Sequence, residues 1–244
     1  MEYSYIPREH IKRNSAFISD TNEQKHLTKV LRKKPGDSIL FVDGNGWIYE
    51  GSLVRIQPNF EIEILQRWED HKKKPINVTL APSLLKGNRL DMVVEKATEL
   101  GVTSIIPVLS SRTVAGSREI GSQRLNRWQR IALNAMKQSL RSRLPYIRPV
   151  MTLTEIIQNA TSYDLSIIAW EEESKISPGM AIKGKLDVKN VLLIIGPEGG
   201  FSQDEIISAR EAGMKTISLG SSRLRSDTAS IAGLTLLMSE LELL

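Results

Sequence analysis

The sequence predicts an α/β protein in which a mostly parallel sheet forms the larger, C-terminal part and a small β-rich domain precedes it. The first observation is a change of pattern after Pro75, where short β-rich runs give way to strands that alternate with helical segments. The second is the stretch VLLIIGPEGGFSQDEI (residues 191–206), in which an apolar run ends in glycines and a helix begins. The third is the composition of the 244 residues, with 41% hydrophobic and 25% charged residues, which is typical of a globular protein with a core.

The first seventy or so residues read as a small barrel-type domain with one helix. Leu27, Val30 and Leu31 have helical spacing and predict a helix over Glu23–Arg32. Runs rich in β-branched and aromatic residues predict three strands, over Asp37–Val42, Trp47–Ile56 and Phe60–Leu65. Asp43–Gly46 (DGNG) supplies the positive-φ residues of a hairpin between the first two. We take HKKKP (residues 71–75) as the linker and divide the chain into domains at 1–72 and 73–244.

The second domain alternates strands and helices. The predicted strands are Asn77–Ala81, Ser104–Val108, Leu165–Trp170, Val191–Ile195 and Thr216–Leu219. The predicted helices are Arg89–Leu100, Gln123–Leu144, Gln203–Ala212 and Thr228–Leu241. In such sheets ligands bind beyond the carboxyl ends of the strands.

Two polar loops occupy that location. Gly196–Gly200 leads into a helix whose start is marked by a capping box, Ser202 with Glu205. Gly220–Asp227 has the same layout, with Ser226 or Asp227 as the helix cap. Each loop alone could be an ordinary tight turn, but two such loops at neighbouring strand ends favour a shared site.

Positive charge is concentrated in the middle of the chain. The net charge is +5 overall but +8 over residues 75–150. On the helix predicted at Gln123–Leu144, basic side chains fall on one side. A solvated helix face is the alternative interpretation, yet such a face normally mixes signs. The pattern favours a polyanionic partner that carries phosphates.

Several classes of function are excluded or disfavoured by what the sequence lacks. It has no cysteine, which rules out disulfides and thiolate chemistry. Neither Gly-x-Gly-x-x-Gly nor a P-loop motif is present. The three histidines, His10, His26 and His71, fall in the first domain or linker, so we expect no metal centre. No apolar run approaches the length of a membrane span, and we expect a soluble, cytoplasmic protein without a membrane partner.

Four stretches together resemble the RsmE family, SPOUT-class methyltransferases of small-subunit ribosomal RNA. They are HLTKVLRKKPGDSILFVDGNG (26–46), KGNRLDMVVEKATELGV (86–102), RWQRIALNAMKQSLRSRLP (127–145) and IGPEGGFSQDEI (195–206). The family's last motif is partly changed, with Ser222 in place of its first Arg, Arg223 in place of Ile, Ser226 in place of Thr and Asp227 in place of Glu. Arg223 could substitute for the missing Arg from the next position.

The resemblance implies a knotted, mostly parallel α/β sheet preceded by a PUA-like β-barrel that binds RNA. It implies a homodimer that uses S-adenosylmethionine to methylate a uridine of 16S ribosomal RNA at ring nitrogen 3. The residues expected to hold the cofactor are Ile195, Gly196, Pro197, Glu198, Gly199, Gly200, Leu219, Gly220, Leu224, Arg225 and Thr228. Those expected to contact RNA are Arg32, Lys86, Arg89, Arg127, Arg130, Lys137, Gln138 and Arg141.

Arg225 and Glu198 are the candidate catalytic residues. The uracil N–H must lose its proton to attack well, and Arg225 could stabilise the resulting anion. Glu198 could take the proton or orient the ring, or it could only shape its loop. Two alternatives stay open: a related SPOUT enzyme that methylates a ribose hydroxyl of transfer or ribosomal RNA, and a non-catalytic RNA-binding assembly protein.

Overall fold

The computed structural model describes residues 2–57, 59–70, 75–113, 121–184 and 187–244. The chain forms two compact units, one of Met1–Lys72 with Leu133–Leu144 and the other of Lys73–Ala132 with Pro145–Leu244. The boundary between the units therefore falls inside a helix as well as near residue 72. Apart from Pro75, the linker expected at residues 71–75 lies outside the described residues.

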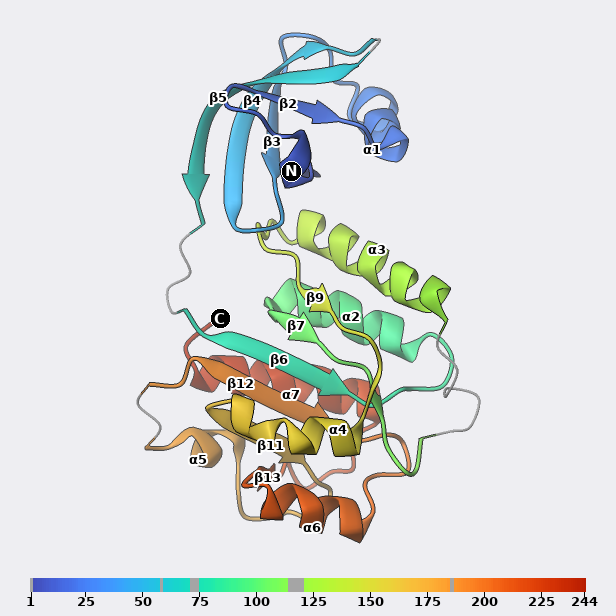
Figure 1. Ribbon diagram of the computed structural model, residues 1–244, viewed down its shortest axis with the longest axis vertical. Helices are drawn as coiled ribbons and strands as arrows, with labels where there is room; N and C mark the ends of the chain where they lie inside the picture. Colours follow the sequence, from blue (N-terminus) through green and yellow to red (C-terminus); the bar gives the residue numbers. More distant parts are fainter. Residues whose placement is uncertain (1, 58, 71–74, 114–120, 185–186) are drawn as a thin grey trace. The chain divides into compact units, whose positions relative to one another are not determined.

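The first unit contains a five-stranded sheet in the order β1-β3-β4-β5-β2 (Figure 1). β1 runs parallel to β3, and the other neighbours are antiparallel. Register shifts between β4 and β5 increase the local twist, and the sheet curls around a core that contains the stacked rings of Phe41 and Tyr49. The strands are β1 (Ser4–Tyr5), β2 (Ser15–Ile18), β3 (Ser38–Val42), β4 (Trp47–Arg55) and β5 (Phe60–Glu69). The three strands predicted here are confirmed, and the third extends four residues beyond Leu65.

The hairpin predicted between β3 and β4 is confirmed in its details. Gly44 and Gly46 have φ values of 77° and 102°, which other residues rarely adopt. The carboxylate of Asp43 accepts the backbone N–H groups of Asn45 and Trp47 at 2.9 and 3.2 Å. The turn is thus fixed by one buried aspartate and two glycines.

The helical part of the first unit is more broken than predicted. A 3₁₀ turn, η1 (Arg8–His10), precedes β2. The expected helix over Glu23–Arg32 begins earlier, as α1 (Thr21–Lys25), because Asp20 accepts the N–H of Asn22 at 2.7 Å and caps it. It continues as a π-helical turn, η2 (His26–Val30), and ends before Arg32, whose φ is 54°.

The second unit contains a six-stranded sheet, parallel throughout, in the order β13-β11-β12-β6-β7-β9. Its strands are β6 (Asn77–Pro82), β7 (Ser104–Ile105), β9 (Tyr146–Ile147), β11 (Leu165–Ala169), β12 (Asn190–Ile195) and β13 (Lys215–Ile217). The strand predicted over Ser104–Val108 is wrong as a single element. Pro107, which has no N–H to donate, separates β7 from β8 (Val108–Leu109), and β8 pairs instead with β10 (Met151–Thr152).

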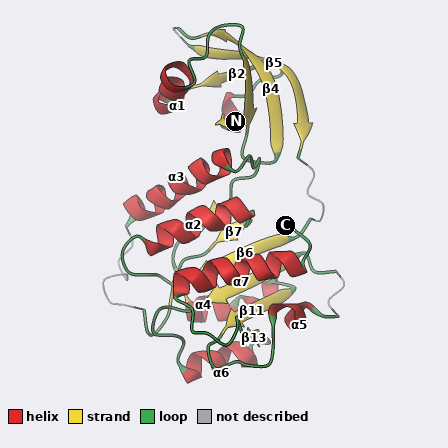
Figure 2. Cartoon of the chain, turned by 180° about the vertical axis from the view of Figure 1, so that it is seen from behind, coloured by secondary structure: helices red, strands yellow, loops and turns green. Residues whose placement is uncertain are grey.

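Helices cover both faces of this sheet (Figures 1 and 2). On one face, α2 and α7 pack against each other and against β6. On the other face, side chains of α4 and α6 pack with those of the sheet in one hydrophobic core. The helices of this unit are α2 (Arg89–Leu100), α4 (Leu153–Gln158), α5 (Pro178–Ile182), α6 (Gln203–Glu211) and α7 (Ser226–Glu240), and a 3₁₀ turn, η4 (Ala160–Ser162), follows α4. The helix α3 (Ser122–Gln138) is divided between the two units after Ala132. No helix within the described ranges combines the length and the apolar character needed to cross a bilayer.

The helix predicted over Gln123–Leu144 ends six residues early. Leu140 adopts a positive φ of 55° just after α3. The N–H of Arg141 then donates to the carbonyl of Met136, and the N–H of Leu140 donates to that of Lys137. This pair of hydrogen bonds is the Schellman ending of a helix, formed here without the usual glycine. Arg141 therefore does not lie on the helix face to which the sequence assigned it.

Candidate functional site

A cleft of about 700 Å³ opens at the carboxyl ends of β11, β12 and β13. Three chain segments, each the continuation of one of these strands, form most of its lining, and Arg112 adds to it from the segment after β8. The lining residues are Arg112, Ala169, Trp170, Glu171, Glu172, Ile195, Gly196, Pro197, Glu198, Gly200, Ser218, Leu219, Gly220, Ser221, Ser222, Arg223, Leu224, Arg225, Ser226 and Ala229. The position matches the place where parallel α/β sheets bind ligands.

The structure brings together most of the residues that were expected to hold a cofactor. Nine of the eleven line the cleft, and the exceptions are Gly199 and Thr228. The carbonyl of Gly199 accepts a hydrogen bond from the guanidinium of Arg112 at 3.1 Å, so Gly199 is linked to the cleft wall through another residue. Thr228 lies exposed in the first turn of α7.

The first wall is the loop that follows β12. Gly200 has a φ of 67°, and its N–H donates to the carbonyl of Pro197 at 3.0 Å. The predicted capping box at the start of α6 is confirmed, with Ser202 and Glu205 bonded reciprocally. The other carboxylate oxygen of Glu205 accepts the N–H of Ser111 at 2.8 Å. The loop is therefore braced internally by Gly200 and held at its C-terminal end by Glu205.

Glu198, the candidate catalytic carboxylate, is exposed on this loop and has a partner. Its Oε1 lies 3.3 Å from the guanidinium of Arg89, the first residue of α2. Arg89 was expected to contact RNA, so the structure links a predicted RNA-binding residue to a predicted catalytic one.

The second wall is the loop between β13 and α7. Gly220 turns the chain with a φ of 124°. Arg225 is exposed and occupies the N-cap position of α7, without a side-chain hydrogen bond to the helix. The expected capping by Ser226 or Asp227 is wrong, because the helix begins at Ser226 and both residues lie inside its first turn. Asp227 still favours this helix end through its negative charge.

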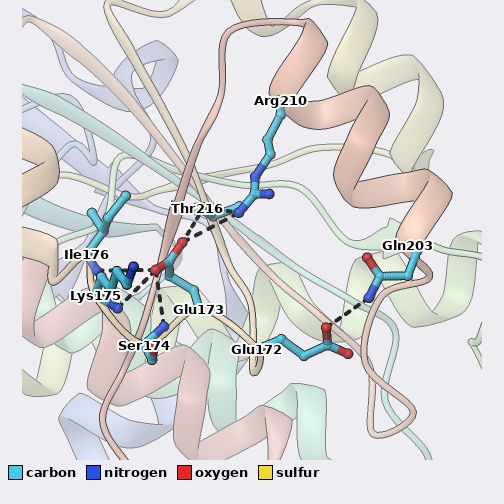
Figure 3. A network of polar contacts seen from close by, with 8 residues as sticks. All are labelled: Glu172, Glu173, Ser174, Lys175, Ile176, Gln203, Arg210 and Thr216. Carbon is cyan, nitrogen blue, oxygen red and sulfur yellow. Dashed lines mark hydrogen bonds and ion pairs between the residues drawn. The ribbon is translucent and has the colours of Figure 1, made fainter.

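The third wall, which the sequence analysis missed, is the segment after β11. Trp170, Glu171 and Glu172 line the cleft, and Glu173 fixes the turn that carries them. As Figure 3 shows, the Glu173 carboxylate accepts hydrogen bonds from the next three residues and from Thr216, and it forms an ion pair with Arg210. It accepts the N–H groups of Ser174, Lys175 and Ile176 at 3.1, 3.0 and 3.4 Å and the Thr216 hydroxyl at 2.8 Å.

The environment of Glu173 favours its ionised form. The backbone N–H of Lys175, followed by the hydroxyl of Thr216, lowers the pKa of Glu173 below its ordinary value of 4.5. Its side chain is only 9% exposed. Arg210 adds an ion pair at 3.5 Å and places its guanidinium 5.0 Å from the ring centre of Trp170. The run WEEES directly after a buried strand was the available sequence signal for this wall.

The residues expected to contact RNA divide between the two units. Arg32, Lys137, Gln138 and Arg141 belong to the first, and Lys86, Arg89, Arg127 and Arg130 to the second. Lys137 pairs with Glu23 at 2.5 Å, and Gln138 bonds to Glu2. Burial lowers the pKa of Arg141, although Asp70 counteracts this shift.

On the second unit, Arg127 and Arg130 have different surroundings. Arg127 lies 2.5 Å from Asp91, whose other oxygen accepts the indole N–H of Trp128 at 2.9 Å. Arg130 is exposed, as are Lys86 and Arg32. Over the described parts of the chain, no group of three or more His, Cys, Asp or Glu side chains is placed to hold a metal ion.

Comparison with known proteins agrees with this architecture. Residues 72–238 match the RNA methyltransferase domain family, and residues 18–65 match the RNA methyltransferase PUA domain. Ribosomal RNA small subunit methyltransferase E of Bacillus subtilis (strain 168) is 29% identical, with 98% of this chain and 96% of that protein covered.

Two solved structures are similar over nearly the whole chain. Ribosomal RNA small subunit methyltransferase E from Neisseria gonorrhoeae, bound to S-adenosylmethionine, is 30% identical with a TM-score of 0.84, covering 98% of this chain and 97% of that one. A Legionella pneumophila methyltransferase with the same bound cofactor is 28% identical with a TM-score of 0.82, covering 96% of each. With a matching catalytic-domain model over most of its length and a cleft at the strand ends, the chain belongs to the RNA methyltransferase family and carries that family's PUA domain at its N-terminal end.

Proposed function

We propose that this protein uses S-adenosylmethionine to methylate a uridine of 16S ribosomal RNA at ring nitrogen 3, giving 3-methyluridine. The observation that carries the proposal is the cleft in which the loops after β12 and β13 meet, lined by nine of the eleven residues expected from the family motifs. The names of the relatives support small-subunit ribosomal RNA as the substrate. The choice of uridine nitrogen 3 rests on the resemblance to the RsmE family, as do the knot, the homodimer and the cytoplasmic location.

The cleft suits a ligand of the size and chemistry of S-adenosylmethionine. Its volume of about 700 Å³ lies within the usual range of small-molecule sites, about 300–1,000 Å³. Ile195, Leu219 and Leu224 offer apolar surface, and the loops at Gly196 and Gly220 bring backbone groups to the cavity. We propose that these residues hold the cofactor, which when bound supplies a methyl group on a sulfonium.

We assign Arg225 to stabilising the negative charge that develops on the base. Its side chain lines the cleft from the start of α7 and is exposed, so it can approach a second molecule. A guanidinium in this position would stabilise the uracil anion that must form before the ring nitrogen attacks. The α7 N-terminus would add a partial positive charge, which Asp227 offsets in part by accepting the N–H of Thr228 at 2.8 Å.

Glu198 is assigned to orienting the base or taking its proton. Arg89 holds one carboxylate oxygen at 3.3 Å, while the side chain remains 28% exposed. The remaining oxygen is available to a uracil N–H. In this arrangement Arg89 acts as a positioning residue for Glu198, in addition to any contact with RNA.

The RNA backbone would be bound by exposed basic side chains in both units. Arg130 and Lys86 are the candidates in the second unit, and Arg32 is the candidate in the first. Contacts with phosphate would position the RNA without selecting its sequence.

The test is transfer of labelled methyl from S-adenosylmethionine to small ribosomal subunits that lack the modification, followed by mass spectrometry of the nucleosides. Appearance of 3-methyluridine is the expected result. A 2′-O-methylated product, or incorporation into transfer RNA alone, would favour the ribose methyltransferase alternative. Absence of both incorporation and cofactor binding would favour the assembly-protein alternative, in which the changed motif at Ser222–Asp227 marks a decayed site.

A further inference from the structure

One acidic side chain of the cleft lies against both loops at once. A Cβ atom added to Gly200, in the loop after β12, would come within 1.9 Å of Oε1 of Glu171. The same oxygen lies 3.9 Å from the guanidinium of Arg223, in the loop after β13. The Glu171 carboxylate therefore occupies the place where the two ligand-binding loops approach each other.

The backbone that presents Glu171 is fixed on both sides. The N–H of Trp170 donates to the carbonyl of Ile217 at 3.0 Å, and the N–H of Ser218 donates to that of Ile176 at 2.8 Å. Between these points the N–H of Glu173 returns to the carbonyl of Trp170 at 3.1 Å. Since the Glu173 carboxylate also binds the following three N–H groups (Figure 3), the turn is held before any ligand arrives. A preorganised carboxylate loses little conformational freedom when it binds a cation.

The three acids of the cleft differ in how firmly they are engaged. Glu172 accepts a hydrogen bond from the side chain of Gln203 at 2.8 Å, and Glu198 has Arg89 at 3.3 Å. Glu171 has Arg223 at 3.9 Å, the upper limit of an ion pair, and the Arg223 side chain is 78% exposed. An exposed pair at this distance is weak and readily exchanged for another cation.

We propose that Glu171 is a specificity-determining residue that recognises a cationic group of the cofactor, and that Arg223 is the counter-ion it exchanges on binding. This inference rests on the proposed function, because it takes S-adenosylmethionine as the ligand. That molecule carries two cations that a carboxylate can recognise, the sulfonium and the α-ammonium of its methionine part. If the sulfonium is the one recognised, Glu171 also distinguishes substrate from product, since methyl transfer removes that charge.

Calorimetric titration with three ligands separates these possibilities. S-adenosylmethionine carries both cations, S-adenosylhomocysteine carries only the ammonium, and 5′-methylthioadenosine carries neither. We expect Glu171→Gln to weaken binding of S-adenosylmethionine about fivefold and to leave 5′-methylthioadenosine unchanged. Unchanged binding of the neutral ligand also shows that the variant is folded around its cleft.

The result with S-adenosylhomocysteine identifies the cation. If Glu171→Gln weakens its binding as much as that of S-adenosylmethionine, Glu171 recognises the ammonium. If its binding is unchanged, Glu171 recognises the sulfonium. Glu172→Gln is the matched control, because it removes the same charge from the next position. If both variants change the selectivity between charged and neutral ligands equally, or if neither changes it, the assignment of Glu171 is overturned.

Arg223→Gln provides a second, independent arm. Removing the competing cation should strengthen binding of S-adenosylmethionine about twofold relative to binding of 5′-methylthioadenosine. Weaker binding of S-adenosylmethionine relative to 5′-methylthioadenosine would contradict the exchange. The inference needs only the cofactor-binding part of the proposed function, and failure of that part has a different signature, since the unaltered protein would then bind none of the three ligands.

Discussion

The carboxylate of Glu198 lies 3.3 Å from the guanidinium of Arg89, which joins the glycine-rich loop after β12 to the start of α2. Both side chains are partly exposed, at 28% and 42%, so water screens the pair and it adds little to stability. Its consequence is geometric. The pair favours one orientation of the Glu198 carboxylate, and in the proposed function this orientation would determine how Glu198 meets the base.

Arg89→Ala should therefore lower kcat about tenfold while the KM for S-adenosylmethionine changes little, because a displaced group costs reaction rate more than cofactor binding. Steady-state assays with labelled methyl give both constants. In a Glu198→Gln background the same change should have no further effect on kcat. A raised KM for RNA with unchanged kcat would instead show that Arg89 serves RNA binding, the role expected from sequence.

Arg225→Ala should reduce turnover about 100- to 1,000-fold, the usual cost of removing a group that stabilises charge in the transition state. Arg225→Lys should retain part of the rate, since it keeps the charge but loses the planar fork. Single-turnover rates are the measurement, with circular dichroism as the check on folding. Full turnover by a folded Arg225→Ala variant would remove Arg225 from the mechanism.

Lys137 should prove structural although the sequence assigns it to RNA. Its ammonium lies 2.5 Å from Glu23, and the two side chains are only 12% and 9% exposed. Lys137→Ala would leave a buried carboxylate without its cation, at a cost of about 3–5 kcal/mol in unfolding free energy. Urea denaturation measures the loss. The double variant Glu23→Leu with Lys137→Met should recover most of it, and a stable Lys137→Ala variant with weakened RNA affinity would contradict this assignment.

The sequence predicted α2 to the residue and placed the strands β6, β11 and β12 within one residue, because each has a strong local pattern and a clear boundary. Gly101 ends α2 with a φ of 95°, and Gly196 follows the last residue of β12. The position of the cleft followed from strand order along the chain, since parallel strands align their carboxyl ends.

The end of α3 and the third cleft wall could not be predicted in the same way. Leu140 takes a left-handed conformation that is usual for glycine, so the sequence contained no stop signal there and predicted a helix to Leu144. The basic face looked free of acids because its partners, Asp91 and Glu23, are distant in sequence. Glu173 gave no periodic signal, since its role depends on Thr216 and Arg210 from elements that meet only in the fold.

Arg130 should contribute to RNA affinity in a salt-dependent manner. It is exposed on α3, whereas its neighbour Arg127 is paired with Asp91. Arg130→Glu should weaken binding of ribosomal RNA and reduce the slope of log K against log salt by about 0.7–0.9 for each phosphate that the variant no longer neutralises. Filter binding at several salt concentrations measures the slope. Arg127→Glu is the comparison and should cost folding stability as well. Unchanged affinity and slope for Arg130→Glu would exclude this surface from RNA binding.

Glu173 should make the cleft sensitive to acid. Because the pKa of Glu173 is lower in the folded protein than its ordinary 4.5, its contribution to stability is complete above that value and is lost as the pH falls through the lowered pKa. Glu173→Gln should therefore be less stable than the unaltered protein at pH 7, by about 1.5–3 kcal/mol for a hydrogen-bonded charge. The difference should narrow as the pH is taken below 4.5. Urea unfolding across this range measures both free energies, and a difference that stays constant with pH would show that the stabilisation does not depend on the charge of Glu173.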